Sequence, residues 1–354
     1  MADNDPGEAI LEPDLPIVDA HHHLWLLSEA ALEAMGQRET ILTAALVPTY
    51  RRTARYLLDE YLADVQTGHN VRASVFIDAH AMYRADGPAH LKSVGEVEFV
   101  NGVAAMAASD LFGPTRACAG IVGGIDLRLG HQAEEVLQAQ LAAGGDRYRG
   151  VRGAGIVYDS DPQILGAAGY SPHVLADPDF RTGFGYLEPL GLSFDIFLLE
   201  PQLPDLIELA RAFPDTQIIL NHLGSPVGVG QYAGQREVRY PIWRENMQIL
   251  AGCENVAVKL GGLGTPLAGF DSFGATPPAS SMQLAAEWTP YVEIAIEAFG
   301  VDRCMFESNF PVDAATCSYP VIWNAFKRIC ASASQAEKAA LFAETACRIY
   351  RLEL

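Results

Sequence analysis

The sequence predicts an α/β protein folded as a (β/α)8 TIM barrel, somewhat distorted and with insertions in its βα loops. Short apolar runs alternate with longer stretches of helical period along the chain, which is typical of a parallel sheet with helices between its strands. About eight apolar runs occur, as closure into a barrel requires. The length of 354 residues fits one such barrel with insertions.

Glycine or proline marks many junctions between the predicted elements. Strands are expected at 16–23, 71–78, 119–127, 149–156, 192–199, 216–222, 255–261 and 303–309. Helical stretches include 52–66, 202–213, 284–299 and 335–350, and the polar stretches near 79–100, 157–180 and 223–240 are expected to be βα loops. An open doubly wound sheet is the alternative, but the Gly-rich phosphate-binding turn of that fold is absent from the sequence.

The domain organisation follows from this alternation. Residues 1–14 are acidic and contain Pro and Gly, so we expect a flexible tail, followed by one barrel domain over 15–354. No signal-peptide pattern is visible, and the apolar runs are far shorter than the ~18 residues of a membrane span. The six cysteines lack metal-site spacing and are expected to be reduced thiols. We therefore expect a cytoplasmic protein.

The charge balance limits the partners. Lys and Arg total 24 against 44 Asp and Glu, which gives a formal net charge of −20. Nucleic-acid binding and docking on anionic lipid both need clustered basic residues, so we expect neither. A small-molecule substrate is expected instead, and a homo-oligomer is left open.

Three adjacent histidines follow the first predicted strand, in Asp19-Ala20-His21-His22-His23. Side chains alternate along a strand, so His21 and His23 share one face, whereas His22 points to the helix layer as a packing residue. The carboxyl ends of barrel strands form the active-site face. These two imidazoles are therefore predicted to converge on one ion or one substrate oxygen.

Other strand ends supply further candidates. Asn221 and His222 close the sixth strand, and Glu307 and Asn309 share a face of the last strand. A buried carboxylate needs a partner, so Glu307 is expected to pair with an interior cation rather than to act in the site.

Two cations and one loop tyrosine are candidates for substrate binding. Arg152 and Lys259 lie near strand ends, where they can clamp a substrate carboxylate. Neutralising interior acids such as Glu307 or Asp195 is the equally weighted alternative for both cations. Tyr83 lies in the long loop after the second strand, from which it can reach a substrate.

Five motifs, in order, resemble the amidohydrolase-related family and its lactonase-like branch. They are D-A-H-H-H-L-W (19–25), V-R-G (151–153), N-H-L-G (221–224), V-K-L-G-G-L (258–263) and M-F-E-S-N-F-P-V-D (305–313). The resemblance implies a distorted barrel, a strand-1 H-x-H at His21 and His23, a strand-6 histidine at His222, and often a divalent metal.

Two positions depart from the family pattern. The family's strand-8 aspartate, which activates water, is replaced by Asn309, and an amide cannot act as a general base. The strand-5 histidine of members with a fuller metal set is absent from 195–201. Asn309 is kept as a candidate catalytic residue through its hydrogen bonds, and Asn221 as a substrate-binding one.

The resemblance and the residues together predict a hydrolase that opens a lactone-type cyclic ester, or cleaves a related C–O or C–N bond, in a small carboxylated or sugar-derived molecule. His21, His23 and His222 are the expected ligands of a metal, zinc if one is bound, because bound zinc brings the pKa of its water to about 7. A metal-free mechanism is left open. The alternatives are non-oxidative decarboxylation and a barrel that only binds a ligand.

Overall fold

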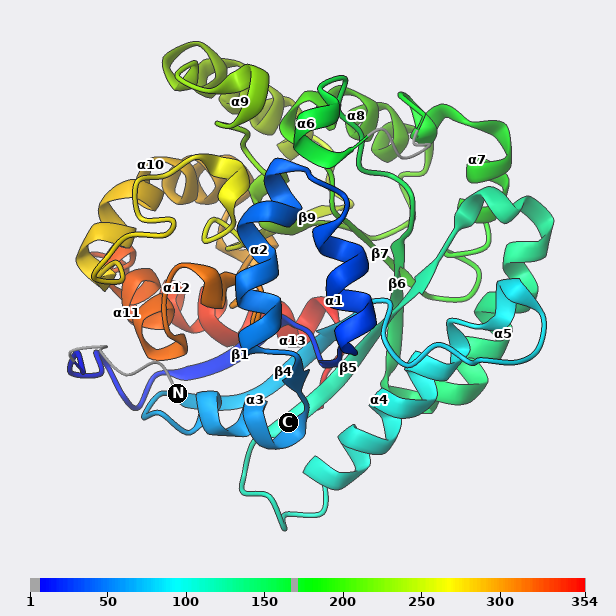
Figure 1. The fold of residues 1–354 in the computed structure, drawn as a ribbon, viewed down its shortest axis with the longest axis horizontal. Coiled ribbons are helices and arrows are strands. Elements are labelled where there is room, and N and C mark those ends of the chain that lie inside the picture. Colours follow the sequence, from blue (N-terminus) through cyan, green and yellow to red (C-terminus); the bar gives the residue numbers. More distant parts are fainter. Residues whose placement is uncertain (1–6, 167–170, 354) are drawn as a thin grey trace.

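The computed structural model describes residues 7–166 and 171–353. Eight parallel strands form one sheet in the order β1-β4-β5-β6-β7-β8-β9-β10, with helices between successive strands (Figure 1). The sheet strands are β1 (Pro16–His22), β4 (Asn70–Ile77), β5 (Arg116–Ile125), β6 (Tyr148–Gly153), β7 (Ser193–Ile196), β8 (Ile218–Leu220), β9 (Val256–Leu260) and β10 (Cys304–Phe306). This arrangement confirms the predicted (β/α)8 TIM barrel.

The barrel closes between its first and last strands. His22 forms a parallel bridge with Phe310, just past the end of β10. The backbone N–H of Asn309 donates to the carbonyl of His21 at 2.9 Å, and that of His23 donates to the carbonyl of Phe310 at 2.8 Å. Closure therefore occurs at the carboxyl ends of the two strands that carry the predicted histidine pair and Asn309.

The helices surround the barrel (Figure 1). They are α1 (Glu29–Gly36), α2 (Ile41–Arg52), α3 (Leu58–Val65), α4 (Val94–Ala107), α5 (Ala133–Gly144), α6 (Pro162–Leu165), α7 (Pro178–Phe184), α8 (Leu203–Ala212), α9 (Arg236–Ala251), α10 (Ser281–Phe299), α11 (Tyr319–Ile329), α12 (Gln335–Ala339) and α13 (Thr345–Ile349). None of the helices in the described residues is long and apolar enough to span a membrane.

The apolar residues form a large core between the strands and the helices and a smaller core within the barrel. The smaller core contains Val18, Val75, Val122 and Met305 from different strands, and the phenol ring of Tyr350 joins it. Burial on both faces explains why the strands are continuous apolar runs rather than alternating ones.

The prediction of one continuous helix over 52–66 is wrong in part. Helix α2 ends at Arg52, and Arg55 and Tyr56 form β3 (Arg55–Tyr56), which pairs antiparallel with β2 (Trp25–Leu26). Helix α3 starts only after this ladder. The cause is a tertiary strand pairing that local helical period cannot reveal.

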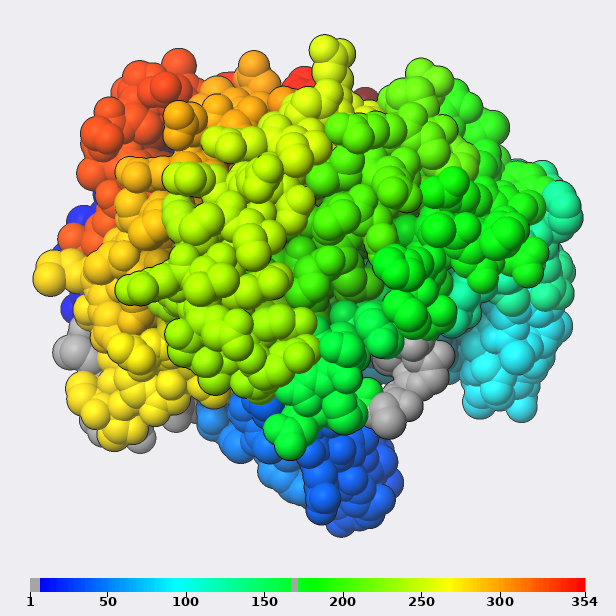
Figure 2. Space-filling view, turned by 90° about the horizontal axis from the view of Figure 1, so that it is seen from above, coloured from blue at the N-terminus to red at the C-terminus, as the bar shows by residue number. Residues whose placement is uncertain are grey.

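The loop after β1 carries a helical insertion. Helices α1 and α2 lie in front of one end of the barrel in Figure 1, and the same segment projects from the surface in Figure 2. Serine 28 caps α1, and Thr40 caps α2 by accepting from the N–H of Thr43 at 3.1 Å. The insertion therefore consists of two defined helices placed at the end of the barrel.

The amino-terminal segment lies along α11. Of the tail expected over 1–14, residues 1–6 lie outside the described residues. Within 7–14, the N–H of Leu11 donates to Asn324 at 2.9 Å, and the Lys327 ammonium donates to the carbonyls of Leu11 and Glu12 at 2.8 and 2.9 Å. These contacts hold that part of the segment on the barrel.

Candidate active site

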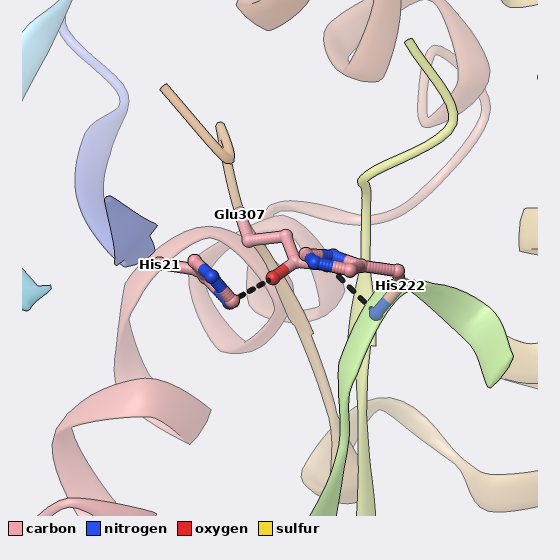
Figure 3. A group of neighbouring side chains, drawn as sticks. All are labelled: His21, His222 and Glu307. Atoms are coloured by element: carbon pink, nitrogen blue, oxygen red, sulfur yellow. Dashed lines mark hydrogen bonds and ion pairs between the residues drawn. The ribbon is translucent and has the colours of Figure 1, made fainter. Parts of the chain in front are cut away.

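One buried carboxylate contacts two imidazoles at the carboxyl ends of β1, β8 and β10. Glu307 Oε2 lies 2.8 Å from His21 Nδ1, and Glu307 Oε1 lies 2.7 Å from His222 Nδ1 (Figure 3). The backbone N–H of His222 also donates to Oε1 at 3.0 Å. Glu307, expected to serve mainly as an interior ion-pair partner, instead fixes the orientation of two predicted site histidines.

His23 joins this group through His21. The Nε2 atoms of the two rings lie 3.1 Å apart, and His23 Nδ1 donates to the carbonyl of Ile77 at 2.8 Å. The rings of His21 and His222 have centroids 4.7 Å apart. The structure thus brings the three predicted histidines together, and their catalytic role stays a prediction.

His22 occupies the opposite face, as expected from strand alternation. Its ring stacks on Tyr61 with centroids 4.0 Å apart, and Nε2 lies 2.9 Å from the Ser74 hydroxyl. Burial lowers the pKa of His22 to about 3. It is therefore an uncharged packing residue.

Lys259 is completely buried beside the histidines rather than in the cavity wall. Its ammonium lies 2.7 Å from Asp195 Oδ1 and 3.3 Å from His21 Nδ1. The Tyr350 hydroxyl donates to the same Asp195 oxygen at 2.8 Å. This placement favours the alternative in which Lys259 neutralises Asp195.

The electrostatic environment favours the uncharged forms of His21 and His23. Burial lowers the pKa of His21 well below its ordinary value, and the positive charge of Lys259 adds to that effect. Burial and then Arg152 lower the pKa of His23 in the same way. Neutral rings retain a lone pair, so both can bind a metal ion or accept a proton.

Two glycines make room for the site. A Cβ at Gly261 would lie 2.5 Å from Cγ of Glu307, and one at Gly262 would lie 2.2 Å from Nδ1 of His222. Gly262 also has a positive φ of 67°, which side chains rarely adopt. Both glycines are therefore required by the two side chains packed against them.

Asn309 contributes an oriented amide. Its Nδ2 donates to Asp313 Oδ1 at 2.7 Å, and Asp313 Oδ2 accepts from the N–H of Gly264 at 3.0 Å. Burial raises the pKa of Asp313 to about 8, against the effect of these hydrogen bonds. Sequence reasoning missed Asp313, although its place at the end of the M-F-E-S-N-F-P-V-D motif was a usable signal.

A cavity of about 360 Å³ opens beside these groups. His23, His222 and Asn309 line it together with residues of the α1–α2 insertion and of the β4 and β6 ends, whose polar members are Arg38, Thr40, Thr43, Tyr50, Asp78, His80 and Arg152. Arg152 Nη1 donates to the carbonyl of Asp78 at 3.2 Å, and its guanidinium lies 5.5 Å from the Phe197 ring centroid. Arg38 and Arg152 form no ion pair with the described residues.

The other two predicted substrate-binding residues lie outside this lining. Tyr83 donates to Asp78 Oδ1 at 3.2 Å and lines an adjoining hollow. Asn221 is completely buried, and both polar atoms of its side chain lack a partner within the described residues. The structure therefore keeps these two apart from the surface that a substrate in the cavity would touch.

His21, His222 and Glu307 form a possible metal site. One ligand atom from each lies within 4.8 Å of the others, and all three residues are buried. Imidazole nitrogen and carboxylate oxygen are both common ligands of divalent metals.

Comparison with known proteins places the chain in a family. The sequence model described as Amidohydrolase matches residues 18–352. The uncharacterized protein y4mH of Sinorhizobium fredii is 36% identical over 345 residues, which cover 96% of this chain and 99% of that protein. An L-fucono-1,5-lactonase of Burkholderia multivorans is 28% identical over 235 residues, covering 66% of this chain and 72% of the lactonase.

A solved structure agrees with this result. A Burkholderia multivorans amidohydrolase with bound zinc is 25% identical, with a TM-score of 0.71, and the alignment covers 95% of this chain and 99% of the other. The chain therefore belongs to the amidohydrolase family and is a hydrolase.

Proposed function

We propose that the enzyme hydrolyses a lactone-type cyclic ester of a small carboxylated or sugar-derived molecule. The observation that carries this proposal is the set of three histidines gathered at the strand ends, two of them in contact with Glu307, with His23 and His222 lining the cavity. The distant relatives named L-fucono-1,5-lactonase support the same reaction.

The cavity suits a small anionic or hydroxylated substrate. Its volume of about 360 Å³ is near the lower end of the usual 300–1,000 Å³ range of ligand sites. Arg38 and Arg152 supply two guanidinium groups free of ion pairs with the described residues, which can bind a carboxylate in bidentate fashion. Threonine hydroxyls and the Asn309 amide supply hydrogen bonds for hydroxyl groups.

Hydrolysis requires polarisation of the ester carbonyl and a group that takes a proton from water. His23 and His222 line the cavity, from which their rings can reach an ester carbonyl bound there. Asn309 cannot take the proton, but it can hydrogen-bond a substrate hydroxyl or the attacking water. Donors placed around a developing oxyanion are commonly among the largest contributions to such catalysis.

The contact between His21 and His23 is compatible with a zinc ion held by these two residues, with His222 proposed as the third ligand. Two nitrogen ligands of a tetrahedral zinc ion, each about 2.0 Å from the metal, lie about 3.3 Å apart. The Nε2 atoms of His21 and His23 are 3.1 Å apart, whereas the 2.7–2.8 Å contacts to Glu307 have hydrogen-bond lengths. Glu307 and the Ile77 carbonyl then orient the ligands from their Nδ1 side, which is typical of metal-bound histidines.

One protonation state of His21 favours a cation at this point. It is the state in which His21 Nδ1, 2.8 Å from Glu307 Oε2, carries the proton, while His23 Nδ1 carries one for Ile77. The two Nε2 lone pairs then face one another at 3.1 Å, and a cation between them would relieve their repulsion. A zinc ion bound there would supply Lewis acidity and would bring the pKa of its water to about 7.

A metal-free arrangement uses the same residues with one proton moved. His21 Nε2 then donates to His23 Nε2, and His21 Nδ1 accepts from Lys259 at 3.3 Å. In this form the histidines act on the carbonyl only through hydrogen bonds. Elemental analysis of the purified protein distinguishes the two forms, because only the first requires one metal ion per chain.

The reaction is tested with L-fucono-1,5-lactone, D-glucono-1,5-lactone and a carboxylate-bearing lactone, using a pH indicator to follow acid release. We expect His21→Ala to lower kcat by about 10²–10⁴-fold. Glu307→Gln should lower activity by about 10–100-fold, as expected when a residue that orients a ligand is changed. His131→Ala is the matched control and should not change the rate. His131 is exposed, contacts the Tyr186 hydroxyl and lies outside the cavity lining.

Turnover by His21→Ala at the wild-type rate would contradict the proposed site. Release of CO₂ from an aromatic acid, with no lactone turned over, would instead favour the decarboxylase alternative. Ligand binding without any turnover would favour the binding barrel.

A further inference from the structure

The cavity wall at the end of β4 carries an imidazole–carboxylate pair that the histidine group described above does not include. His80 Nδ1 lies 3.2 Å from Asp78 Oδ2 and 3.0 Å from the Tyr83 hydroxyl. His80 and Asp78 both line the cavity. The His80 side chain is 63% exposed, against 3% for Asp78, and its Nε2 has no hydrogen-bond partner within the described residues.

The carboxylate of this pair is held firmly in place. The backbone N–H of His80 donates to Asp78 Oδ1 at 3.3 Å. A Cβ at Gly124 on the neighbouring strand β5 would lie 2.3 Å from that oxygen, so only glycine leaves room for the carboxylate. Residues at the ends of two adjacent strands, β4 and β5, therefore fix the position of the Asp78 carboxylate.

Glu96 shapes the loop that presents His80. Its Oε1 accepts from the N–H groups of Ala79 and Ala81 at 3.1 and 2.8 Å. Burial and the neighbouring Asp78 raise the pKa of Glu96 well above its ordinary value. Burial alone would also raise the pKa of Asp78, but hydrogen bonds from Glu96 and His80 outweigh burial and lower it. The pKa values of the two carboxyl groups are therefore shifted in opposite directions, and Glu96 holds a proton more readily than Asp78.

Lactone hydrolysis needs a proton acceptor, and in the zinc form proposed above His21, His23 and His222 would be occupied as ligands. Asn309 is an amide and cannot act as a base. His23 Nδ1 is used by Ile77, His222 Nδ1 is used by Glu307, and the Nε2 atoms of His21 and His23 face each other. His80 differs because it is not one of the proposed zinc ligands. Its ring lines the cavity, its Nε2 has no hydrogen-bond partner within the described residues, and its Nδ1 lies 3.2 Å from a carboxylate, as in a general base oriented by an acid.

We propose that His80, oriented by Asp78, is the catalytic group that transfers the proton in the hydrolysis proposed above, on which this inference rests. As the water oxygen bonds to the carbonyl carbon, its proton passes to His80 Nε2 and the carbonyl electron pair moves to oxygen. When the tetrahedral intermediate collapses, the ring C–O bond breaks and His80 returns the proton to the leaving alkoxide. One water is consumed, and the product is the open hydroxy acid.

The charges around His80 set the expected pH dependence. Asp78 and Tyr83 face it from its own loop, Arg152 faces it from β6, and His90 and Asp126 line the adjoining hollow. The contact with Asp78 raises the pKa of His80, and Arg152 opposes this rise. Activity should therefore fall as the pH drops through a value above the ordinary ~6.5 of histidine.

The variants His80→Gln and Asp78→Asn test the proposal with L-fucono-1,5-lactone as substrate. We expect His80→Gln to lower kcat by about 10²–10⁴-fold and to remove the acidic limb of the pH profile. Asp78→Asn should move that limb to lower pH. His173→Gln is the matched control, because His173 also contacts an aspartate, Asp205 at 3.0 Å, and is 73% exposed, but lies outside the cavity lining.

Circular dichroism and the thermal midpoint establish that each variant is folded. A kcat of His80→Gln within threefold of the wild-type value, or an acidic limb that survives in this variant, would overturn the proposal.

A substrate-independent measurement separates this proposal from the proposed function. In ¹⁵N-histidine NMR spectra, neutral His80 should carry its proton on Nδ1, and Asp78→Asn should lower its pKa. A proton on Nε2, or a pKa that Asp78→Asn leaves unchanged, would overturn the His80 assignment even if every lactone tested were inert. Inert lactones with the expected NMR result would overturn only the proposed function.

Discussion

Two buried lysines each lie beside a histidine, in two distant regions of the barrel. Lys259 on β9 lies 3.3 Å from His21 Nδ1 at the candidate site, and Lys327 on α11 lies 2.9 Å from His69 Nδ1 beneath the amino-terminal segment. The two lysines are 0% and 1% exposed. The same pair of residue types is therefore buried twice, with different surroundings.

The partners of the two ammonium groups differ. Lys259 pairs with the Asp195 carboxylate at 2.7 Å, whereas Lys327 donates to the backbone carbonyls of Leu11 and Glu12. A carboxylate neutralises a buried charge, but a carbonyl only hydrogen-bonds it. In keeping with this, burial lowers the pKa of Lys327 to about 8.

This difference shows how context sets the role of a buried lysine. Lys259, neutralised by Asp195, stays beside His21 and contributes to keeping that imidazole uncharged. Lys327 fastens residues near the amino terminus to α11. Variants of both lysines test this interpretation.

Lys259→Met should have the largest effect on stability. It would leave Asp195 buried without its cation, which typically costs about 3–5 kcal/mol of unfolding free energy. Urea denaturation followed by circular dichroism measures the loss. Adding Asp195→Leu should recover much of it, because replacing both partners by apolar groups is often neutral. A smaller loss than for Lys327→Met would contradict the comparison.

Lys327→Met should lower the unfolding free energy by less, about 1–3 kcal/mol, because it leaves carbonyl oxygens without a donor and leaves no buried charge unpaired. The same urea experiment measures it. Lys92→Met is the matched control, since Lys92 is partly exposed and forms no ion pair with the described residues, so a change within about 0.5 kcal/mol is expected. A loss equal to that of Lys259→Met would show that the partner's charge does not matter.

His69 should give the smallest effect, visible only as a pH dependence. Burial lowers its pKa to about 4, so between pH 4 and 6.5 the unfolded chain binds a proton that the folded one does not. The stability from neutral His69 is present above pH 6.5 and is lost as pH falls towards 4. His69→Gln should reduce the slope of unfolding free energy against pH in this window, and an unchanged slope would exclude His69 as its source.

The strands and their polar ends could be predicted from the sequence. All eight strands occur where apolar runs flanked by glycine or proline predicted them, because strands covered on both faces must be apolar. Strand alternation also separated His22 from its neighbours. The prediction of a helix over 52–66 failed because Arg55 and Tyr56 pair with a strand about 30 residues earlier in the chain. The local period of apolar residues contains no information about such pairing.

The sequence alone determined the number and order of strands, the family, and the presence of histidines at two strand ends, since these depend on local apolar patterning and on motifs. Only the tertiary structure decided that Glu307 contacts both His21 and His222, the latter 85 residues before it in the chain. It also decided that Lys259 pairs with Asp195 and that Asp78 contacts His80 at the cavity. Burial and partners that are distant in the chain set the charge and orientation of a polar side chain, and the fold establishes both.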